Sequence, residues 1–258
     1  MHELPLVFFT VLSQIAVGLA LITYISYRVN LSDLAVLRKA NVVALVLVAV
    51  AVVFSFFHLG KMFRVFNMLF GAGTSAMSNE IILCGAFFAL LACTLFFGFI
   101  KKNESLEAVF NMIALIVGLV FIWSITKVYT IPTVINWDTP FTALQMWCTL
   151  LVGGGAVAAL VGARKLGIIA LFVGVILSFA FKPFYFSFLG EISPMLTSEQ
   201  TTFWLVQLVC LAIALFFGAI TLFKKENVAS FLSIAAIAVV IGELSSRVAF
   251  YNLWSIPM

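Results

Sequence analysis

Side chains that can exchange protons gather in one short interval of an otherwise apolar chain. The interval, residues 56–81, reads FFHLGKMFRVFNMLFGAGTSAMSNEI and contains His58, Arg64 and Glu80. Histidine and glutamate are common proton acceptors in proteins, and a neighbouring arginine holds a carboxylate in its ionised form. Further along the sequence, Glu243 and Arg247 are spaced i, i+4, which places them on one helix face where they can pair.

The amino-acid composition excludes a soluble domain. Of the 258 residues, 64% are hydrophobic and 9% are charged, and the mean hydropathy is +1.23. A soluble protein of this composition would expose large apolar patches and precipitate. The apolar runs are continuous rather than alternating, and about 20 apolar residues span a bilayer as a helix, so they predict membrane-spanning helices.

We therefore expect an all-α integral membrane protein, in which residues 1–258 form a single transmembrane domain of eight bundled helices. The first segment lacks a basic n-region, which favours a retained helix over a cleaved signal peptide. Few residues remain outside the runs, so any large catalytic domain must belong to another polypeptide. The predicted spans are residues 5–27, 40–59, 81–100, 108–128, 141–162, 166–181, 202–223 and 228–250.

The distribution of basic residues predicts the orientation. Cytoplasmic loops are rich in Lys and Arg, and the loops after the first, third, fifth and seventh spans hold nine of the 14 basic residues. Both termini are therefore expected outside, on the periplasmic side of a bacterial inner membrane, together with the interval 56–81. The nine residues are Arg28, Arg38, Lys39, Lys101, Lys102, Arg164, Lys165, Lys224 and Lys225.

Within and beside the membrane, apart from the cytoplasmic loops, every ionisable group is predicted at or above mid-membrane on the outer side, and the inner halves of the spans contain no Asp, Glu, Lys, Arg or His. Ser78 or Asn79 is expected to cap the third helix, with Glu80 in its first turn, and Gln14 lies about halfway down the first helix. We expect Lys127 and Lys182 to extend to the interface. The tyrosines and tryptophans near the helix ends are expected to form interface belts. These are Trp123, Trp137, Trp147, Tyr129, Tyr185, Tyr251 and Trp254.

A small-residue face is predicted on the fifth span, where close helix packing is favoured. It consists of Gly153, Gly154, Gly155, Ala158 and Gly162.

A polar pocket open to one side suits the oxidation of a quinol, which releases two protons and two electrons. Such a site needs an apolar cleft for the ring, hydrogen-bond partners for its oxygens and proton acceptors with an exit to water. His58 and Glu80 meet that description, and Arg64 or Arg247 could fix the carboxylate. The alternatives are an interfacial histidine, a glutamate that only ends a helix, and a structural Glu243–Arg247 pair.

The residues argue against metal cofactors in this protein. A haem with two histidine ligands needs them facing one another from spanning helices, whereas the sequence has only His2, before the first helix, and His58. The four cysteines lie in apolar runs without the spacing of iron–sulfur, zinc or disulfide sites. We expect no haem, no iron–sulfur cluster and no other metal here, so an electron acceptor must lie in a partner protein close to the outer face.

Four segments resemble the membrane anchor subunits of bacterial dimethyl sulfoxide reductases, in the same order and over nearly the whole sequence. They are HELPLVFFTVLSQIAVG at 2–18, FHLGKMFRVFNML at 57–69, SNEI at 78–81 and GELSSRVAFY at 242–251. Family members often have Ser-Pro after the His-Leu-Gly motif, where this protein has Lys61, Met62 and Phe63.

The resemblance implies a haem-free anchor that oxidises menaquinol in anaerobic respiration. Its electrons would pass to a subunit with four iron–sulfur clusters and on to a subunit carrying molybdopterin guanine dinucleotide, both periplasmic. The family's quinol-site histidine falls on His58 and its important glutamate on Glu80. Gln14, Arg64, Glu243 and Arg247 are then expected to shape the site.

Two other functions are compatible with a membrane protein of this size. A small secondary transporter predicts inverted repeats and broken helices at mid-membrane, and a membrane scaffold predicts no quinone chemistry. None of the three functions has the protein act on the terminal substrate itself, and none involves a nucleic acid. Membrane lipid is its expected solvent.

Overall fold

A computed structural model of the protein describes residues 4–58, 69–224 and 227–254, and all regular elements in this part are helical. Eight of the helices are long and apolar enough to cross a membrane, which confirms the predicted all-helical, multi-pass architecture. A short turn, Leu69–Gly71, precedes α4, and a π-helical segment, Phe96–Ile100, extends it. The α-helices are α1 (Leu4–Arg28), α2 (Leu34–His58), α4 (Ala76–Leu95), α5 (Glu104–Tyr129), α6 (Pro140–Val161), α7 (Arg164–Ile192), α8 (Pro194–Phe223) and α9 (Val228–Asn252).

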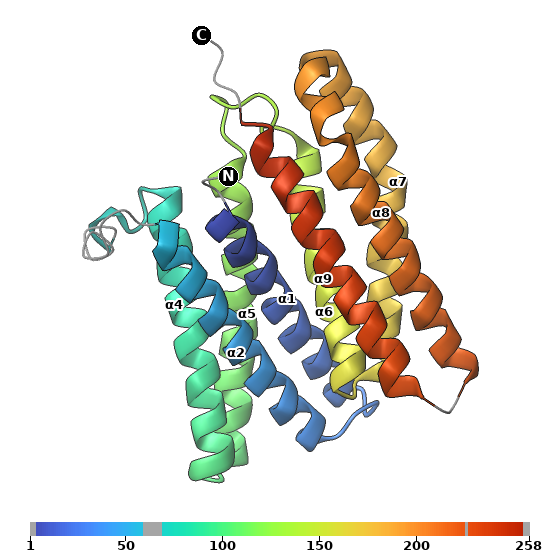
Figure 1. The fold of residues 1–258 in the computed structure, drawn as a ribbon. Helices are drawn as coiled ribbons and strands as arrows, with labels where there is room; N and C mark the ends of the chain where they lie inside the picture. The colour runs from blue at the N-terminus through green and yellow to red at the C-terminus, as the bar shows by residue number, and fades with distance from the viewer. Residues whose placement is uncertain (1–3, 59–68, 225–226, 255–258) are drawn as a thin grey trace.

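Helix α1 lies at the centre of the bundle. It contacts α2 and α5 on one side and α6, α7 and α9 on the other (Figure 1). The described residues begin and end at one end of the bundle, drawn at the top in Figure 1 and called here the upper end. The lower end carries eight of the nine clustered basic residues, while Lys225 lies outside the described residues.

Helices α1 and α6 meet through glycines, as the predicted small-residue face requires. A Cβ atom added to Gly154 would lie 2.6 Å from the Cα of Gly18, and one added to Gly18 would collide with the carbonyl of Leu150. On the neighbouring face of α6, a Cβ on Gly155 would lie 2.7 Å from the carbonyl oxygen of Gly167 in α7. The backbones therefore pack directly against one another, and α6 holds α1 and α7 together.

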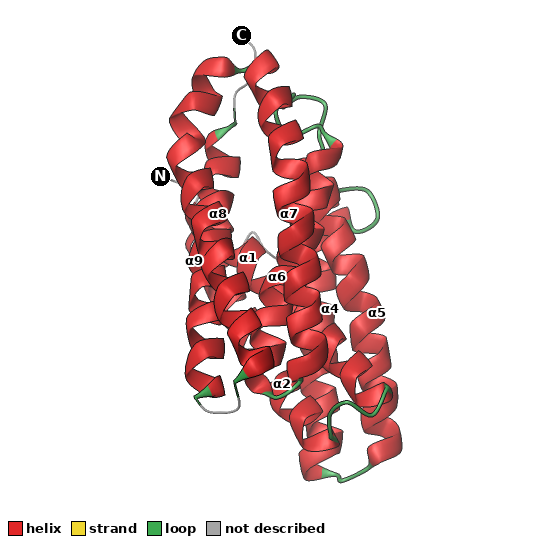
Figure 2. Cartoon of the chain, turned by 90° about the vertical axis from the view of Figure 1, so that its right-hand side faces the viewer, coloured by secondary structure: helices red, strands yellow, loops and turns green. Residues whose placement is uncertain are grey.

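The sixth and seventh predicted spans were too short. Helix α7 is 29 residues long and continues through Lys182 and Pro183 to Ile192. Helix α8 begins at Pro194, not near Thr202. A proline inside a helix removes one backbone hydrogen bond, and the apolar sequence after Pro183 outweighs that loss. At 1.5 Å per residue both helices are about 44 Å long, and their hairpin rises above the upper ends of α1 and α4 (Figure 1; side view in Figure 2).

The lower turns of the helices are not free of charged groups, contrary to the prediction for the inner halves of the spans. Helices α2 and α5 begin earlier than expected, so Arg38 is the fifth residue of α2 and Glu107 lies in the first turn of α5. The Arg38 guanidinium donates to both carboxylate oxygens of Glu107, at 2.8 and 2.6 Å. Gly98 of the π-helical segment lies against this pair, because a Cβ there would stand 2.6 Å from Glu107 Oε1. The ion pair neutralises both charges and ties α2 to α5.

Replacing Gly154 by valine tests the packing of α1 on α6. The added side chain would overlap Gly18, and we expect the free energy of unfolding to fall by about 1–3 kcal/mol or more. The thermal unfolding midpoint of the detergent-solubilised protein measures it. Gly85→Val is the matched control, because nothing lies within 4 Å of a Cβ at that position. Equal midpoints for the two variants would contradict the packing described here.

Candidate functional site

Glu80 is buried at the upper end of the bundle. Helix α4 begins at Ala76 with Ser75 as its N-cap, whose hydroxyl accepts a hydrogen bond from the Ser78 amide. The predicted cap at Ser78 or Asn79 is therefore wrong, and Glu80 lies one turn further inside the helix than expected. Its side chain is 5% exposed, and Oε1 has no hydrogen-bond partner among the described residues. An enclosed carboxylate oxygen without a partner is costly, so this atom is well placed to accept a proton or a hydrogen bond.

The register of three helices fixes what lies beside Glu80. A Cβ on Gly118 of α5 would lie 3.0 Å from the ring of Phe87 in α4 and 3.2 Å from Val17 in α1. Seven residues make nearly two helical turns, so the same faces meet again about 10.5 Å higher. Glu80, Ile125 and Thr10 are therefore level with one another, which places Glu80 between α4, α5 and α1.

Two tyrosines lie just above that level. The hydroxyl of Tyr251 in α9 is 2.5 Å from that of Tyr129 in α5 and 3.5 Å from the carbonyl oxygen of Leu6 in α1. Both rings pack edge-on against Trp137 and Phe250. Tyr129 is four residues beyond Ile125 in α5, so it lies about one turn above the level of Glu80. Both tyrosines are buried, whereas the sequence predicted interfacial belt residues.

One turn below Tyr251, Arg247 is the centre of a second buried network. Its guanidinium donates to Gln14 Oε1 at 2.8 Å and to Thr149 Oγ1 at 3.1 Å, and it contacts the sulfur of Met146. Glu243 accepts hydrogen bonds from Thr149 at 2.6 Å and from Gln207 at 2.9 Å. Thr149 thus bridges Glu243 and Arg247, and no direct ion pair between them occurs in the described part of the protein. The two residues lie in one network, as predicted, but they do not form the direct ion pair that was predicted.

Lys182 is a further buried cation, although we predicted that it would extend to the interface. It is 1% exposed and donates to Ser246 at 3.3 Å. Its ammonium group lies 5.7–6.0 Å from the centres of four aromatic rings, which stabilise a cation through their π-faces. These rings belong to Phe181, Tyr185, Phe186 and Trp204. The burial of Lys182 was missed because Lys182 directly precedes Pro183, and the predicted sixth span ended at residue 181.

The structure brings most of the predicted site residues into one region of the upper half. Gln14, Glu243 and Arg247 share a network, and Tyr251 connects this network to the surroundings of Glu80. His58 is the last residue of α2, and its side chain lies outside the described residues, as does Arg64 entirely. The bridging Thr149 and the two tyrosines were not predicted from the sequence, since neither residue type signals a buried role by itself.

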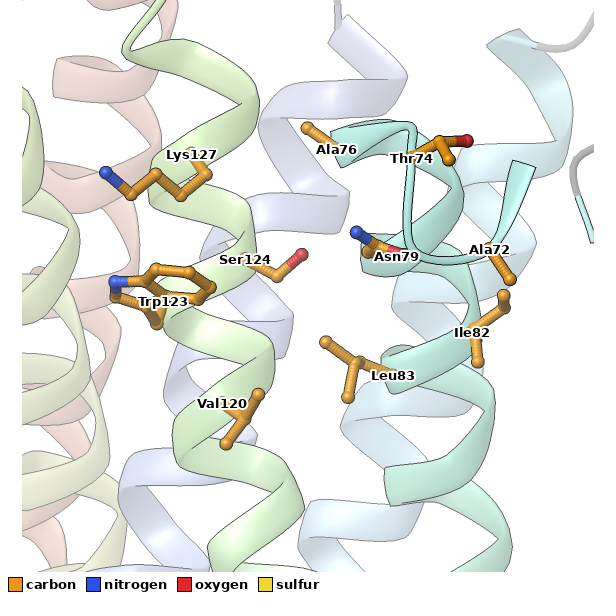
Figure 3. A pocket seen from close by; sticks show the side chains of 10 residues that line it. All are labelled: Ala72, Thr74, Ala76, Asn79, Ile82, Leu83, Val120, Trp123, Ser124 and Lys127. Atoms are coloured by element: carbon orange, nitrogen blue, oxygen red, sulfur yellow. The ribbon is translucent and has the colours of Figure 1, made fainter.

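A groove between α4 and α5 lies beside this region. It has a volume of about 510 Å³, and its described lining includes none of the four predicted site residues whose side chains the structure describes, Gln14, Glu80, Glu243 and Arg247. Asn79 and Ser124 project toward one another across it, with Leu83 and Val120 below them (Figure 3). Its wall is polar at the upper end and apolar toward the membrane interior, which suits an amphipathic ring. The described residues that line it are Ala72, Thr74, Ala76, Asn79, Ile82, Leu83, Val120, Trp123, Ser124 and Lys127.

Comparison with known proteins agrees with this architecture. Residues 1–181 match the family described as DMSO reductase anchor subunit (DmsC). The sequence is also 30% identical, over 272 aligned residues, to the YnfH subunit of an anaerobic dimethyl sulfoxide reductase of Escherichia coli K12, covering 98% of this protein and 95% of that one. The protein belongs to the DMSO reductase anchor subunit family.

Two other members of this family match over part of their length. The C subunit of the anaerobic dimethyl sulfoxide reductase of Haemophilus influenzae is 34% identical over 157 residues, which cover 60% of this protein and 56% of that one. The corresponding C subunit of Escherichia coli K12 is 31% identical over 160 residues, which cover 59% of this protein and 55% of that one. Both alignments span little more than half of these relatives.

Charge balance in the network of this anchor subunit predicts an unequal response to neutralisation. Glu243→Gln removes the one anion of this network and leaves the buried cations Arg247 and Lys182 without it, and we expect the free energy of unfolding to fall by about 3–5 kcal/mol. Arg247→Met leaves one anion, Glu243, and one cation, Lys182, so the free energy of unfolding is expected to fall by less. The double variant regains part of the loss. Thermal unfolding of the solubilised protein measures the order, and an Arg247→Met variant less stable than Glu243→Gln would contradict this charge balance.

Proposed function

We propose that this protein is the menaquinol-oxidising anchor of a molybdoenzyme complex in the bacterial inner membrane. In this proposal the upper end is periplasmic and faces a subunit with four iron–sulfur clusters. That subunit passes electrons to a catalytic subunit carrying molybdopterin guanine dinucleotide. The basic residues at the lower end support this orientation, and family membership supports the role in a DMSO reductase-type complex.

One observation carries the proposed chemistry: the enclosed carboxylate oxygen of Glu80, without a hydrogen-bond partner among the described residues, near the groove between α4 and α5. A quinol hydroxyl is the kind of donor that this oxygen lacks, and its isoprenoid tail suits the apolar part of the groove. Menaquinol supplies two electrons and two protons when bound there. Glu80 accepts a proton at Oε1, and we assign the second proton to His58 at the end of α2.

The other predicted residues position the site electrostatically. Arg247 and Lys182 stabilise negative charge nearby, and Gln14 orients the Arg247 guanidinium through their 2.8 Å hydrogen bond. We assign a similar role to Arg64 in the connection between α2 and α4. No haem or iron–sulfur cluster belongs to this subunit in the proposal, so electrons leave directly to the partner at the upper end.

The transporter alternative gains no support from the helices. A transporter of the broken-helix type would unwind a spanning helix at mid-membrane, and the spanning helices within the described ranges are continuous there. The scaffold alternative differs from the proposal in a single property, which is whether Glu80 takes part in turnover.

Glu80→Gln separates the proposal from the scaffold. The amide keeps the shape of the side chain but cannot accept the proton, and we expect quinol oxidation by the assembled complex to fall about 100-fold or more. Co-purification of the partner subunits shows that assembly is normal. The matched control is Glu191→Gln, an exposed acid at the upper end. Unchanged quinol oxidation in a normally assembled Glu80→Gln complex would establish the scaffold instead.

The proposal also predicts that turnover moves no net charge across the membrane. Protons released at the upper end and consumed there in substrate reduction do not cross the bilayer. Quinol-driven turnover in sealed vesicles is expected to leave a potential-sensitive dye unchanged, while a quinol-oxidising proton pump serves as the positive control. A membrane potential that grows with turnover and collapses with an uncoupler would refute the one-sided mechanism.

A further inference from the structure

The paired hydroxyls of Tyr129 and Tyr251 have one more hydrogen than their mutual contact uses. Each tyrosine carries one O–H donor and can also accept, and the 2.5 Å contact between them uses one of the two hydrogens. Two arrangements satisfy the pair. Either Tyr251 donates to Tyr129, whose own hydrogen is then free, or Tyr129 donates to Tyr251, which then donates to the Leu6 carbonyl at 3.5 Å.

The two arrangements differ in the direction of the hydrogen bond, and a pair that can switch between them can pass a proton from one side to the other. In the first, the free hydrogen of Tyr129 is available toward Glu80, whose Oε1 lacks a partner among the described residues. In the second, Tyr129 is ready to accept a proton from the side of Glu80. The register derived from Phe87, Gly118 and Val17 puts Glu80 about one turn below Tyr129.

The same pair lies close to the water at the upper end. Tyr129 is the last residue of α5, and Tyr251 is the last but one of α9. The next residue, Asn252, is exposed, and Thr130 lines a second groove of about 420 Å³ between α5 and α6. Both tyrosines therefore lie at helix ends, above the level of the buried carboxylate and next to residues that reach the surface or the groove.

We infer that Tyr129 and Tyr251 relay to the upper surface the protons that Glu80 accepts, an inference that rests on the proposed function. Glu80 gives its proton to one hydroxyl of the pair, and the other hydroxyl releases a different proton toward water. The hydrogen bonds then reverse, so the tyrosines return to their starting state without net gain or loss of a proton. No electrons pass through them, because these leave to the iron–sulfur partner.

The charges below the pair give the relay its direction. Arg247 lies one turn below Tyr251 on α9, and Lys182 contacts the adjacent Ser246. A proton moving down from the pair would approach these two cations, with Glu243 as the counter-charge already bound to Thr149 and Gln207. Like charges at close range in a medium of low dielectric repel strongly, so protons are directed upward. Tyr129 and Tyr251 are thus relay residues that act through Glu80 and do not touch the quinol.

Tyr129→Phe, Tyr251→Phe and the double variant test the relay in the assembled complex, with a soluble naphthoquinol as donor. Phenylalanine keeps the ring packing against Trp137 and Phe250. We expect turnover to fall about tenfold or more, the KM for quinol to stay within about twofold, and the solvent deuterium isotope effect to rise. Because the two hydroxyls act as one unit, the double variant should be no slower than the slower single variant.

Tyr24→Phe is the control, because it removes a tyrosine hydroxyl from the lower half of α1, where that hydroxyl lies 3.8 Å from the sulfur of Met112. It is expected to change neither the rate nor the isotope effect. Wild-type rate and isotope effect in both Tyr129→Phe and Tyr251→Phe, alongside a slow Glu80→Gln, would overturn the relay and leave the proposed function standing. A wild-type complex that does not oxidise quinol, or a fast Glu80→Gln variant, would overturn the proposed function and the relay together.

Discussion

Charge buried in a membrane must be compensated, and the structure is organised around one such compensation. Arg247 of α9 donates hydrogen bonds to Gln14 of α1 and to Thr149 of α6. Thr149 in turn donates a hydrogen bond to Glu243 of α9. These bonds join the three helices at mid-height, where the backbones of α1 and α6 already touch through Gly18 and Gly154. Removing the Glu243 carboxylate would leave the Arg247 and Lys182 charges uncompensated within this network in a low-dielectric interior, at a cost of about 3–5 kcal/mol. The core of the bundle is therefore rigid at the level of the network.

This rigid core contrasts with the α4–α5 hairpin, which carries Glu80 and the groove between α4 and α5. The hairpin is attached to the rest of the bundle through limited contacts with α1, α2 and α6. Among the described residues, its polar connections include Arg38–Glu107 at the lower end, Tyr129–Tyr251 at the upper end, and a weak contact of Tyr24 with the sulfur of Met112. A site beside such a hairpin can admit a bulky apolar ring from the bilayer while the charged network on α9 stays fixed. The proposed quinol chemistry and the one-sided proton release both follow from this division.

The sequence predicted those parts of the fold that composition and spacing determine. Apolar runs identified the eight spans, the glycine cluster identified the close contact of α6, and the i, i+4 spacing placed Glu243 and Arg247 together. The errors arose where tertiary contacts outweigh local signals. Lys182 and Pro183 indicated a helix end, yet four aromatic rings and Ser246 stabilise the buried lysine and α7 continues. Tyr129 and Tyr251 looked like belt residues, because no local pattern shows that two helix ends converge on one hydrogen bond.

The central claim is that quinol binds at the upper end beside Glu80. A photoreactive azido-naphthoquinone probe, applied to the complex in membranes and followed by peptide mapping, locates the ring directly. We predict labelled peptides from residues 72–83 of α4 and its preceding turn and from residues 120–129 of α5, with labelling abolished by excess menaquinone. Specific, competable labelling at the lower end near Arg38 and Glu107, or at the lipid-exposed sides of α7 and α8 alone, would contradict this claim.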